Sequence, residues 1–238
     1  LQWQALHGWL GAYAGAGAYL REDNPDLAYY GPCEFRLNRR RMTWELTQVL
    51  WAPDAEKNEF FPLVPSPSGA QILTTQVSGR NRTYLYSHDG PQVVYMERNG
   101  RWQPVAAICC VYHVSSRDRR DSATAAKDIQ PTGQFSGMNP LDGLIWSDKN
   151  KDGRLTLDEC IVVRADSAVA GGQGPFSKLR IGDGYGGRVG ADLCIFAHGL
   201  TCYRPIGFTD DGAPIYGTEG ILTYGVEDSG DLVPVTEE

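Results

Sequence analysis

The sequence predicts an all-β protein built from antiparallel four-stranded meanders. Three observations lead to this prediction. Short stretches combine aromatic and β-branched residues with polar ones, Asp-Gly and Asn-Gly dipeptides separate several of these stretches, and helical periodicity is scarce. Glycine is abundant, at 28 of 238 residues, which indicates many turns. A chain of this length can bury its own core, so we expect a single β-rich domain over residues 1–238.

The first predicted strand is "RMTWELTQVLW" (41–51). Met42, Trp44 and Leu46 alternate with polar residues in it, and its Thr and Trp content suits a strand better than a helix.

The clearest unit covers residues 71–108, in which the strands "QILTTQV", "TYLYS", "PQVVYMER" and "RWQPVAAI" follow one another. Asp89-Gly90 and Asn99-Gly100 lie between strands and tolerate the positive φ angles of tight hairpin turns. The four strands therefore form one predicted antiparallel meander, about the size of a propeller blade.

A second, looser unit follows. Its predicted strands are 141–147, 159–165, 191–199, 200–208 and 213–217, with an Asp-Gly turn in "TDDGAP". We expect these strands to form another antiparallel meander with a long insertion. The polar stretches 115–138 and 166–190 are expected to be surface loops.

This succession of meanders favours a β-propeller or part of one. No strict repeat of residue identities accompanies the repeated strands and turns. A β-sandwich with several hairpins would produce the same local signals and stays open as the alternative.

Composition argues against two classes of partner. The 22 Lys and Arg residues against 29 Asp and Glu give a net charge of −7, which argues against nucleic acid. No run of 18 apolar residues occurs, so no membrane span is expected.

The apolar N-terminal stretch lacks a basic start, and we expect the chain to begin inside a longer precursor. The six cysteines show no CxxC spacing, and buried thiols or disulfides both stay open.

The stretch "DKNKDGRLTLDE" (148–159) matches the twelve-residue calcium loop of the EF-hand. Gly153 would permit the sharp bend at position 6, Thr156 could act through water at position 9, and Leu155 would point into the fold. The predicted Ca²⁺ ligands are Asp148, Asn150, Asp152, Arg154 through its backbone carbonyl, and Glu159. A polar turn without a metal is the competing interpretation, because Asp, Asn and Gly also favour turns.

The flanks of this loop are not helical. "GLIWS" precedes it and "CIVVRA" follows it, and both stretches are typical of strands. A calcium sensor needs amphipathic helices on both sides, so we expect a structural site that ties two strands together. Its affinity would fall in the weak extracellular range of roughly 10⁻⁴ to 10⁻³ M.

Three stretches together resemble large secreted bacterial β-propeller proteins, related to NHL and quinoprotein-type propellers, in which a blade carries a D-x-N-x-D-G calcium loop. The stretches are "YLYSHDGPQVVYMERNGRWQPVAAI", "LIWSDKNKDGRLTLDECIVV" and "LTCYRPIGFTDDGAPIYG", within residues of roughly 71–217. The resemblance implies an extracellular or periplasmic propeller, often one part of a long chain, with the same metal-binding positions and no catalytic residue. About four or five blades would fit this length, so the chain would be a fragment of a larger propeller.

We therefore expect a calcium-stabilised module that binds a carbohydrate or protein ligand, with other domains of a longer chain as further partners. The alternative is a propeller enzyme acting on polysaccharide or using a redox cofactor. Glu34, Glu45, Asp89, Glu97 and Asp183 are the carboxylates that could form a hydrolytic pair. No ligand spacing joins His7, His88, His113 and His198, and "GDGYGG" (182–187) precedes a strand-like stretch where a dinucleotide site needs a helix.

Overall fold

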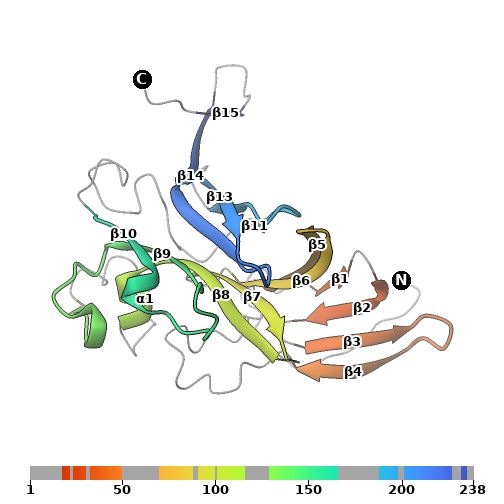
Figure 1. Cartoon of the computed structure of the whole chain (residues 1–238). Helices are drawn as coiled ribbons and strands as arrows, with labels where there is room; N and C mark the ends of the chain where they lie inside the picture. Colours follow the sequence, from red (N-terminus) through yellow and green to blue (C-terminus); the bar gives the residue numbers. More distant parts are fainter. Residues whose placement is uncertain are drawn as a thin grey trace.

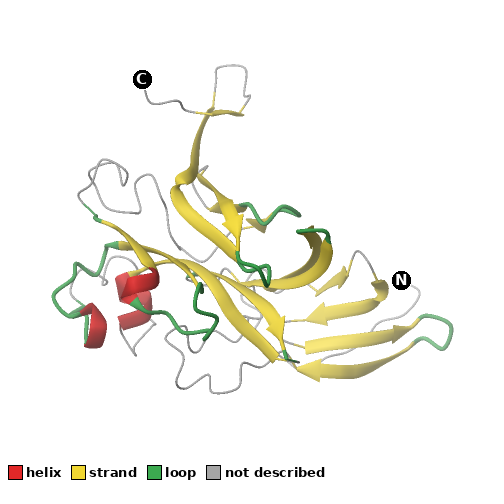
Figure 2. Ribbon diagram, in the orientation of Figure 1, coloured by secondary structure: helices red, strands yellow, loops and turns green. Residues whose placement is uncertain are grey.

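The computed structural model describes residues 18–21, 24–30, 33–49, 70–87, 91–99, 101–115, 129–165, 188–197, 201–226 and 232–234. Over these residues the protein is mostly β, with antiparallel sheets and almost no helix, which confirms the all-β fold class (Figure 1, Figure 2). In the same residues, no helix combines the length and apolar character needed to cross a membrane.

The described strands form three sheets, and within each sheet strands adjacent in sequence are adjacent in space. The first sheet contains β1 (Ala18–Arg21), β2 (Asn24–Tyr30), β3 (Cys33–Asn38) and β4 (Thr43–Val49). The second contains β5 (Ala70–Val77), β6 (Arg80–Ser87), β7 (Gln92–Arg98), β8 (Arg101–Cys110), β9 (Gly143–Ser147) and β10 (Cys160–Val163). The third contains β11 (Arg188–Val189), β12 (Ile195–Ala197), β13 (Thr201–Phe208), β14 (Pro214–Val226) and β15 (Leu232–Pro234).

The predicted meander over residues 71–108 is confirmed as β5 to β8. Asn99, with a φ of 53°, turns the chain between β7 and β8 as its type predicts. The turn between β5 and β6 uses Ser78 and Gly79, with φ angles of 50° and 75°, and is not among the predicted turns. Asp89-Gly90 lies outside the described residues. The predicted strand over residues 41–51 is present as β4.

The second predicted unit is wrong as a single meander, because its strands divide between two sheets. β9 pairs with β8, from Ala106↔Ser147 to Cys110↔Gly143, and β10 adds beyond it. The later strands β12, β13 and β14 form the third sheet instead. Turn residues fix where strands end but not which sheet edge accepts the next strand, so the sequence pattern could not distinguish these arrangements.

The surface-loop prediction for residues 115–138 is also incomplete. After β8 the chain forms a short helix, α1 (Val111–Ser115), and later a 3₁₀ turn, η2 (Gly133–Phe135). Phe135 is only 3% exposed and packs into the main core cluster. Residues 116–128 and 166–187 of the two predicted loops lie outside the described part of the chain, and residues 188–189 belong to β11.

The core is centred on the middle of the second sheet. β9 is buried along its whole length, and β7 is buried from Gln92 to Met96. Cys109 and Cys110 point to opposite faces of β8, yet both are fully buried, so protein covers both faces there. Each large apolar side chain removed from water, such as Trp146 or Ile108, contributes about 1.5–3 kcal/mol.

The third sheet packs on the second, with β14 against β8 and β9. The Tyr216 amide donates to Ser147 Oγ at 3.1 Å, and the Tyr84 hydroxyl donates to the Gly212 carbonyl at 2.7 Å. The first sheet also contacts the second, since Arg21 Nη2 donates to Thr74 Oγ1 at 3.1 Å. Because Ser147 ends β9, the segment that follows it begins against the third sheet.

Candidate metal centre

The acidic loop 148–159 connects two paired strands, as the sequence predicts. It starts directly after β9 and ends in a 3₁₀ turn, η3 (Leu157–Glu159), that leads into β10. The Trp146↔Cys160 pairing brings the two ends of the loop together. The Asp148 amide donates to the Val105 carbonyl at 2.9 Å, so the loop leaves the sheet only after its first residue.

Local hydrogen bonds fold this loop back on itself. Asn150 Oδ1 accepts from the Asp152 amide at 2.9 Å, and Asp152 Oδ1 accepts from the Arg154 amide at 2.7 Å. Lys151 and Gly153 have φ angles of 67° and 70°, in the left-handed region that tight bends require. Gly153 therefore has the backbone conformation expected of position 6, where a residue with a Cβ would be strained.

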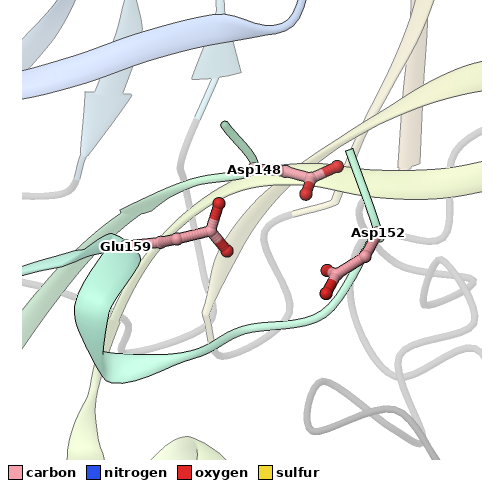
Figure 3. Close-up of side chains that lie close together, drawn as sticks. All are labelled: Asp148, Asp152 and Glu159. Atoms are coloured by element: carbon pink, nitrogen blue, oxygen red, sulfur yellow. The ribbon is translucent and has the colours of Figure 1, made fainter. Parts of the chain in front are cut away.

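Three carboxylates meet inside the loop. One ligand oxygen from each of Asp148, Asp152 and Glu159 lies within 4.8 Å of the other two. Figure 3 shows these side chains lying around the space that the loop encloses. Of the other predicted ligands, Asn150 lies beside Asp152, with its Nδ2 donating to Asp152 Oδ2 at 3.2 Å, and Arg154 has an exposed side chain.

Glu159 is held by donors on both carboxylate oxygens. Oε1 accepts from the amides of Lys149 and Asn150 at 2.8 and 2.9 Å. Oε2 accepts from Thr156 Oγ1 at 3.2 Å and from Trp146 Nε1 at 3.4 Å. These bonds fix the orientation of a carboxylate that is only 8% exposed.

Asp148 is fully buried and forms an ion pair with Arg98 from the end of β7. Its other oxygen, Oδ1, accepts from the Gly153 amide at 3.2 Å. Burial raises the pKa of Asp148, and the adjacent guanidinium only partly opposes this shift. The first predicted ligand therefore lies where an added positive charge stabilises its ionised form.

Arg98 also joins the loop to the third sheet. Its Nε and Nη2 lie 2.9 and 2.8 Å from Asp211 Oδ2, in the turn between β13 and β14. Nearby, Lys151 Nζ lies 2.6 Å from Asp210 Oδ1 in the same turn. The sequence predicts this turn but gives no signal that the turn packs against the acidic loop.

Two anchors hold the second half of the loop. Leu155 is fully buried, as expected for position 8. The side chain of Gln134, in η2, makes two hydrogen bonds to the backbone of this segment. Its Nε2 donates to the Leu155 carbonyl at 2.9 Å, and its Oε1 accepts from the Leu157 amide at 3.1 Å. No sequence pattern links residues 21 and 23 positions apart in this way, and Gln134 was not predicted.

The donor set fits a hard divalent cation. Carboxylate, amide and backbone carbonyl oxygens are the ligands that Ca²⁺ and Mg²⁺ take in proteins, and among the described residues no sulfur or imidazole joins the group. Of the three acidic side chains, Asp148 pairs with the Arg98 guanidinium, while no ion pair with Asp152 or Glu159 occurs among the described residues, which leaves negative charge for a cation to neutralise.

The other candidate residues form no comparable group within the described part of the chain. Glu34 is buried in the first sheet and accepts hydrogen bonds from Tyr29 and from Thr47, the latter at 2.7 Å. Glu45 is in β4 and Glu97 is in β7. His113 Nδ1 accepts from the Cys110 amide at 2.9 Å, which is a structural role. Outside the described residues are His7, His88, His198, Asp89, Asp183 and the glycine-rich stretch 182–187.

Comparison with known proteins gave no match: no family model matches the chain, and no curated protein or solved structure is significantly similar to it. The loop geometry is therefore the basis for any assignment.

Proposed function

We propose that this chain is a calcium-binding, calcium-stabilised β-propeller module that acts outside the cytoplasm, where its loops bind a carbohydrate or a protein. The observation that carries the proposal is the meeting of Asp148, Asp152 and Glu159 within one loop. Asp148, Asn150, Asp152, Glu159 and the Arg154 carbonyl would hold the ion, whose charge would offset the repulsion among the carboxylates.

Calcium is the favoured cation because of the variety of oxygen donors. Ca²⁺ accepts six to eight oxygens in flexible geometry, whereas Mg²⁺ demands a near-ideal octahedron and releases its water reluctantly. A loop closed by side chain to backbone hydrogen bonds, such as those of Asn150 and Asp152, can adjust to the larger ion. The site lies between two strands of one sheet, which suits a structural role rather than a switch.

The order of the sheets supports the propeller assignment. Each sheet is an antiparallel meander, and the first contains four strands while the second begins with the four strands β5 to β8. Propeller blades are meanders of this kind placed one after another. The added strands β9 and β10 then bring the metal-binding loop to the edge of a blade.

Thermal unfolding tests the metal assignment. We expect Ca²⁺ at about 100 times its dissociation constant to raise the free energy of unfolding by about 2.7 kcal/mol, with a smaller rise in Mg²⁺ and none in chelator. Glu159→Gln should lose most of the calcium-dependent rise, because a ligand charge is removed. Asp158→Asn is the matched control, since Asp158 is the adjacent acidic residue and is exposed. Equal melting temperatures in Ca²⁺, Mg²⁺ and chelator would refute the proposal.

A further inference from the structure

Two cysteines lie side by side in the third sheet. Phe196 of β12 pairs with Cys202 of β13 in the antiparallel register. Cys194 is two residues before Phe196, so it faces the same side of the hairpin as Cys202. Diagonal neighbours of this kind interact across a pair of strands. Burial raises the pKa of Cys194, and the neighbouring Cys202 thiol adds to this shift.

The surroundings hold Cys194 in this position. Its thiol donates to Asp192 Oδ2 at 3.0 Å, and its amide donates to Asp192 Oδ1 at 3.0 Å. Its carbonyl accepts from the Gly190 amide at 2.9 Å, which closes the turn between β11 and β12. Cys194 and Cys202 are only 6% and 2% exposed. These bonds hold Cys194 in the turn before β12.

We propose that Cys194 and Cys202 are a disulfide-forming pair, which links the chain entering β12 to β13. This inference is independent of the calcium site. The other described cysteines differ in placement: Cys109 and Cys110 are consecutive and point to opposite faces of β8, while Cys33 lies in the first sheet and Cys160 in β10. The juxtaposition of two thiols on one face occurs, within the described residues, at 194 and 202.

The reaction needs an external oxidant, for which a disulfide such as oxidised glutathione serves. One cysteine thiolate attacks the glutathione disulfide and releases one glutathione thiolate, which leaves a mixed disulfide. The second cysteine thiolate then attacks the cysteine sulfur of that mixed disulfide and releases the second glutathione thiolate. The protein thus loses two electrons and two protons, and glutathione disulfide becomes two thiols.

The environment also indicates when the bond forms. Burial raises the pKa of Cys194 to about 12, and the hydrogen bond to the Asp192 carboxylate adds to this shift. Burial also raises the pKa of Cys202. Little thiolate is therefore present in the folded reduced protein, and exchange is expected during folding, before the hairpin closes over the thiols.

The test is to refold the denatured, reduced chain in a mixture of reduced and oxidised glutathione, then denature it and alkylate the remaining thiols. We expect four alkylated cysteines, because two of the six are joined. The tryptic peptide that follows Arg188 contains both cysteines, so it should be unalkylated and lighter by two hydrogen atoms. Chymotrypsin, which cleaves after Phe196, should yield two peptides held together by a reducible bond.

Single variants provide the controls. Cys194→Ser and Cys202→Ser should each leave every remaining cysteine alkylated. Cys33→Ser, in another sheet, should keep the linked peptide pair. If a serine variant does not refold, the peptide masses of the unsubstituted chain still decide the question. Six alkylated cysteines, or a linkage from either residue to a different cysteine, would overturn the proposal.

Discussion

Two acidic bends of this protein face each other, one in the loop 148–159 and one in the turn 209–212. Each contains an Asp-Gly pair with glycine in the left-handed region, Gly153 at 70° and Gly212 at 94°. In the turn, each carboxylate has a partner with a positive charge: Asp211 pairs with Arg98 and Asp210 with Lys151.

The loop is different. Asp148 shares the same Arg98, while the carboxylates of Asp152 and Glu159 accept only from amides and neutral side chains among the residues described. The Asp-Gly pair therefore supplies a bend in both places, but only the loop gathers carboxylates that no cationic side chain matches. That unmatched charge, rather than the motif alone, distinguishes a candidate metal centre from a turn.

Arg98→Met, which tests the ion pair between Arg98 and the loop, has the largest expected effect. The change removes the guanidinium from the fully buried Asp148, and an uncompensated buried charge costs about 3–5 kcal/mol. Saturating Ca²⁺ should recover part of this loss, because a cation in the loop would take over the role of the guanidinium. Chemical denaturation with and without Ca²⁺ measures both effects.

Arg154→Met is the matched control for that experiment, since Arg154 is in the loop but its side chain is exposed. It should change the free energy of unfolding little. Equal losses from the two substitutions would show that the ion pair of Arg98 is not important.

Replacing Gly153 and Gly212 with alanine, one at a time, tests how strongly each bend depends on its glycine. The left-handed conformation should cost Gly153→Ala about 1–2 kcal/mol, and its added Cβ would meet Gln103 only at ordinary contact distance, 3.7 Å. Gly212→Ala should cost more, because its φ of 94° lies farther from the left-handed minimum at about 57°, and the Arg82 side chain would also have to move away from the added Cβ. Urea unfolding midpoints rank the two variants, and the reverse order would contradict the greater backbone strain inferred for the turn.

The smallest expected effect concerns acid. Burial would raise the pKa of Asp211, but the Thr209 hydroxyl and Arg98 lower it below its ordinary value. A lowered folded pKa adds stability that is complete above about pH 3.9, the unfolded value, and is lost as the pH falls through the folded pKa. The difference in free energy of unfolding between the unsubstituted chain and Asp211→Asn should therefore shrink as the pH falls below about 3.9.

Asp210→Asn is the control for the acid series, because Asp210 is 82% exposed and forms a solvent-screened ion pair. Its effect at neutral pH should be too small to measure. A constant difference between Asp211→Asn and the unsubstituted chain at all pH values would contradict the lowered pKa.

The sequence predicted the parts of this structure that depend on local chemistry. Strand alternation and turn residues identified β4 and the meander β5 to β8, and the loop pattern identified Asp148, Asp152 and Glu159, which the fold brings together. The positive φ of Gly153 and the burial of Leu155 agree with the positions assigned to them.

The parts it missed depend on contacts between distant segments. The edge strand β8 pairs with β9, and no local signal in the sequence specifies this pairing. The prediction that β9 belongs to one meander with the later strands is therefore wrong. Arg98 is 50 residues from Asp148 in the sequence, and no sequence pattern indicates that the two side chains pair. The placement of Cys194 and Cys202 on one face of the hairpin also follows only from the strand register.

The amide of Gln134 has one more consequence. It satisfies the Leu155 carbonyl and the Leu157 amide, two backbone groups of the loop that would otherwise need another partner. The described residues contain no second acidic group of this kind. The fraction of loops with a bound cation would therefore rise hyperbolically with cation concentration, with a Hill coefficient of about one. The response of the protein would be gradual and would show no sharp threshold concentration.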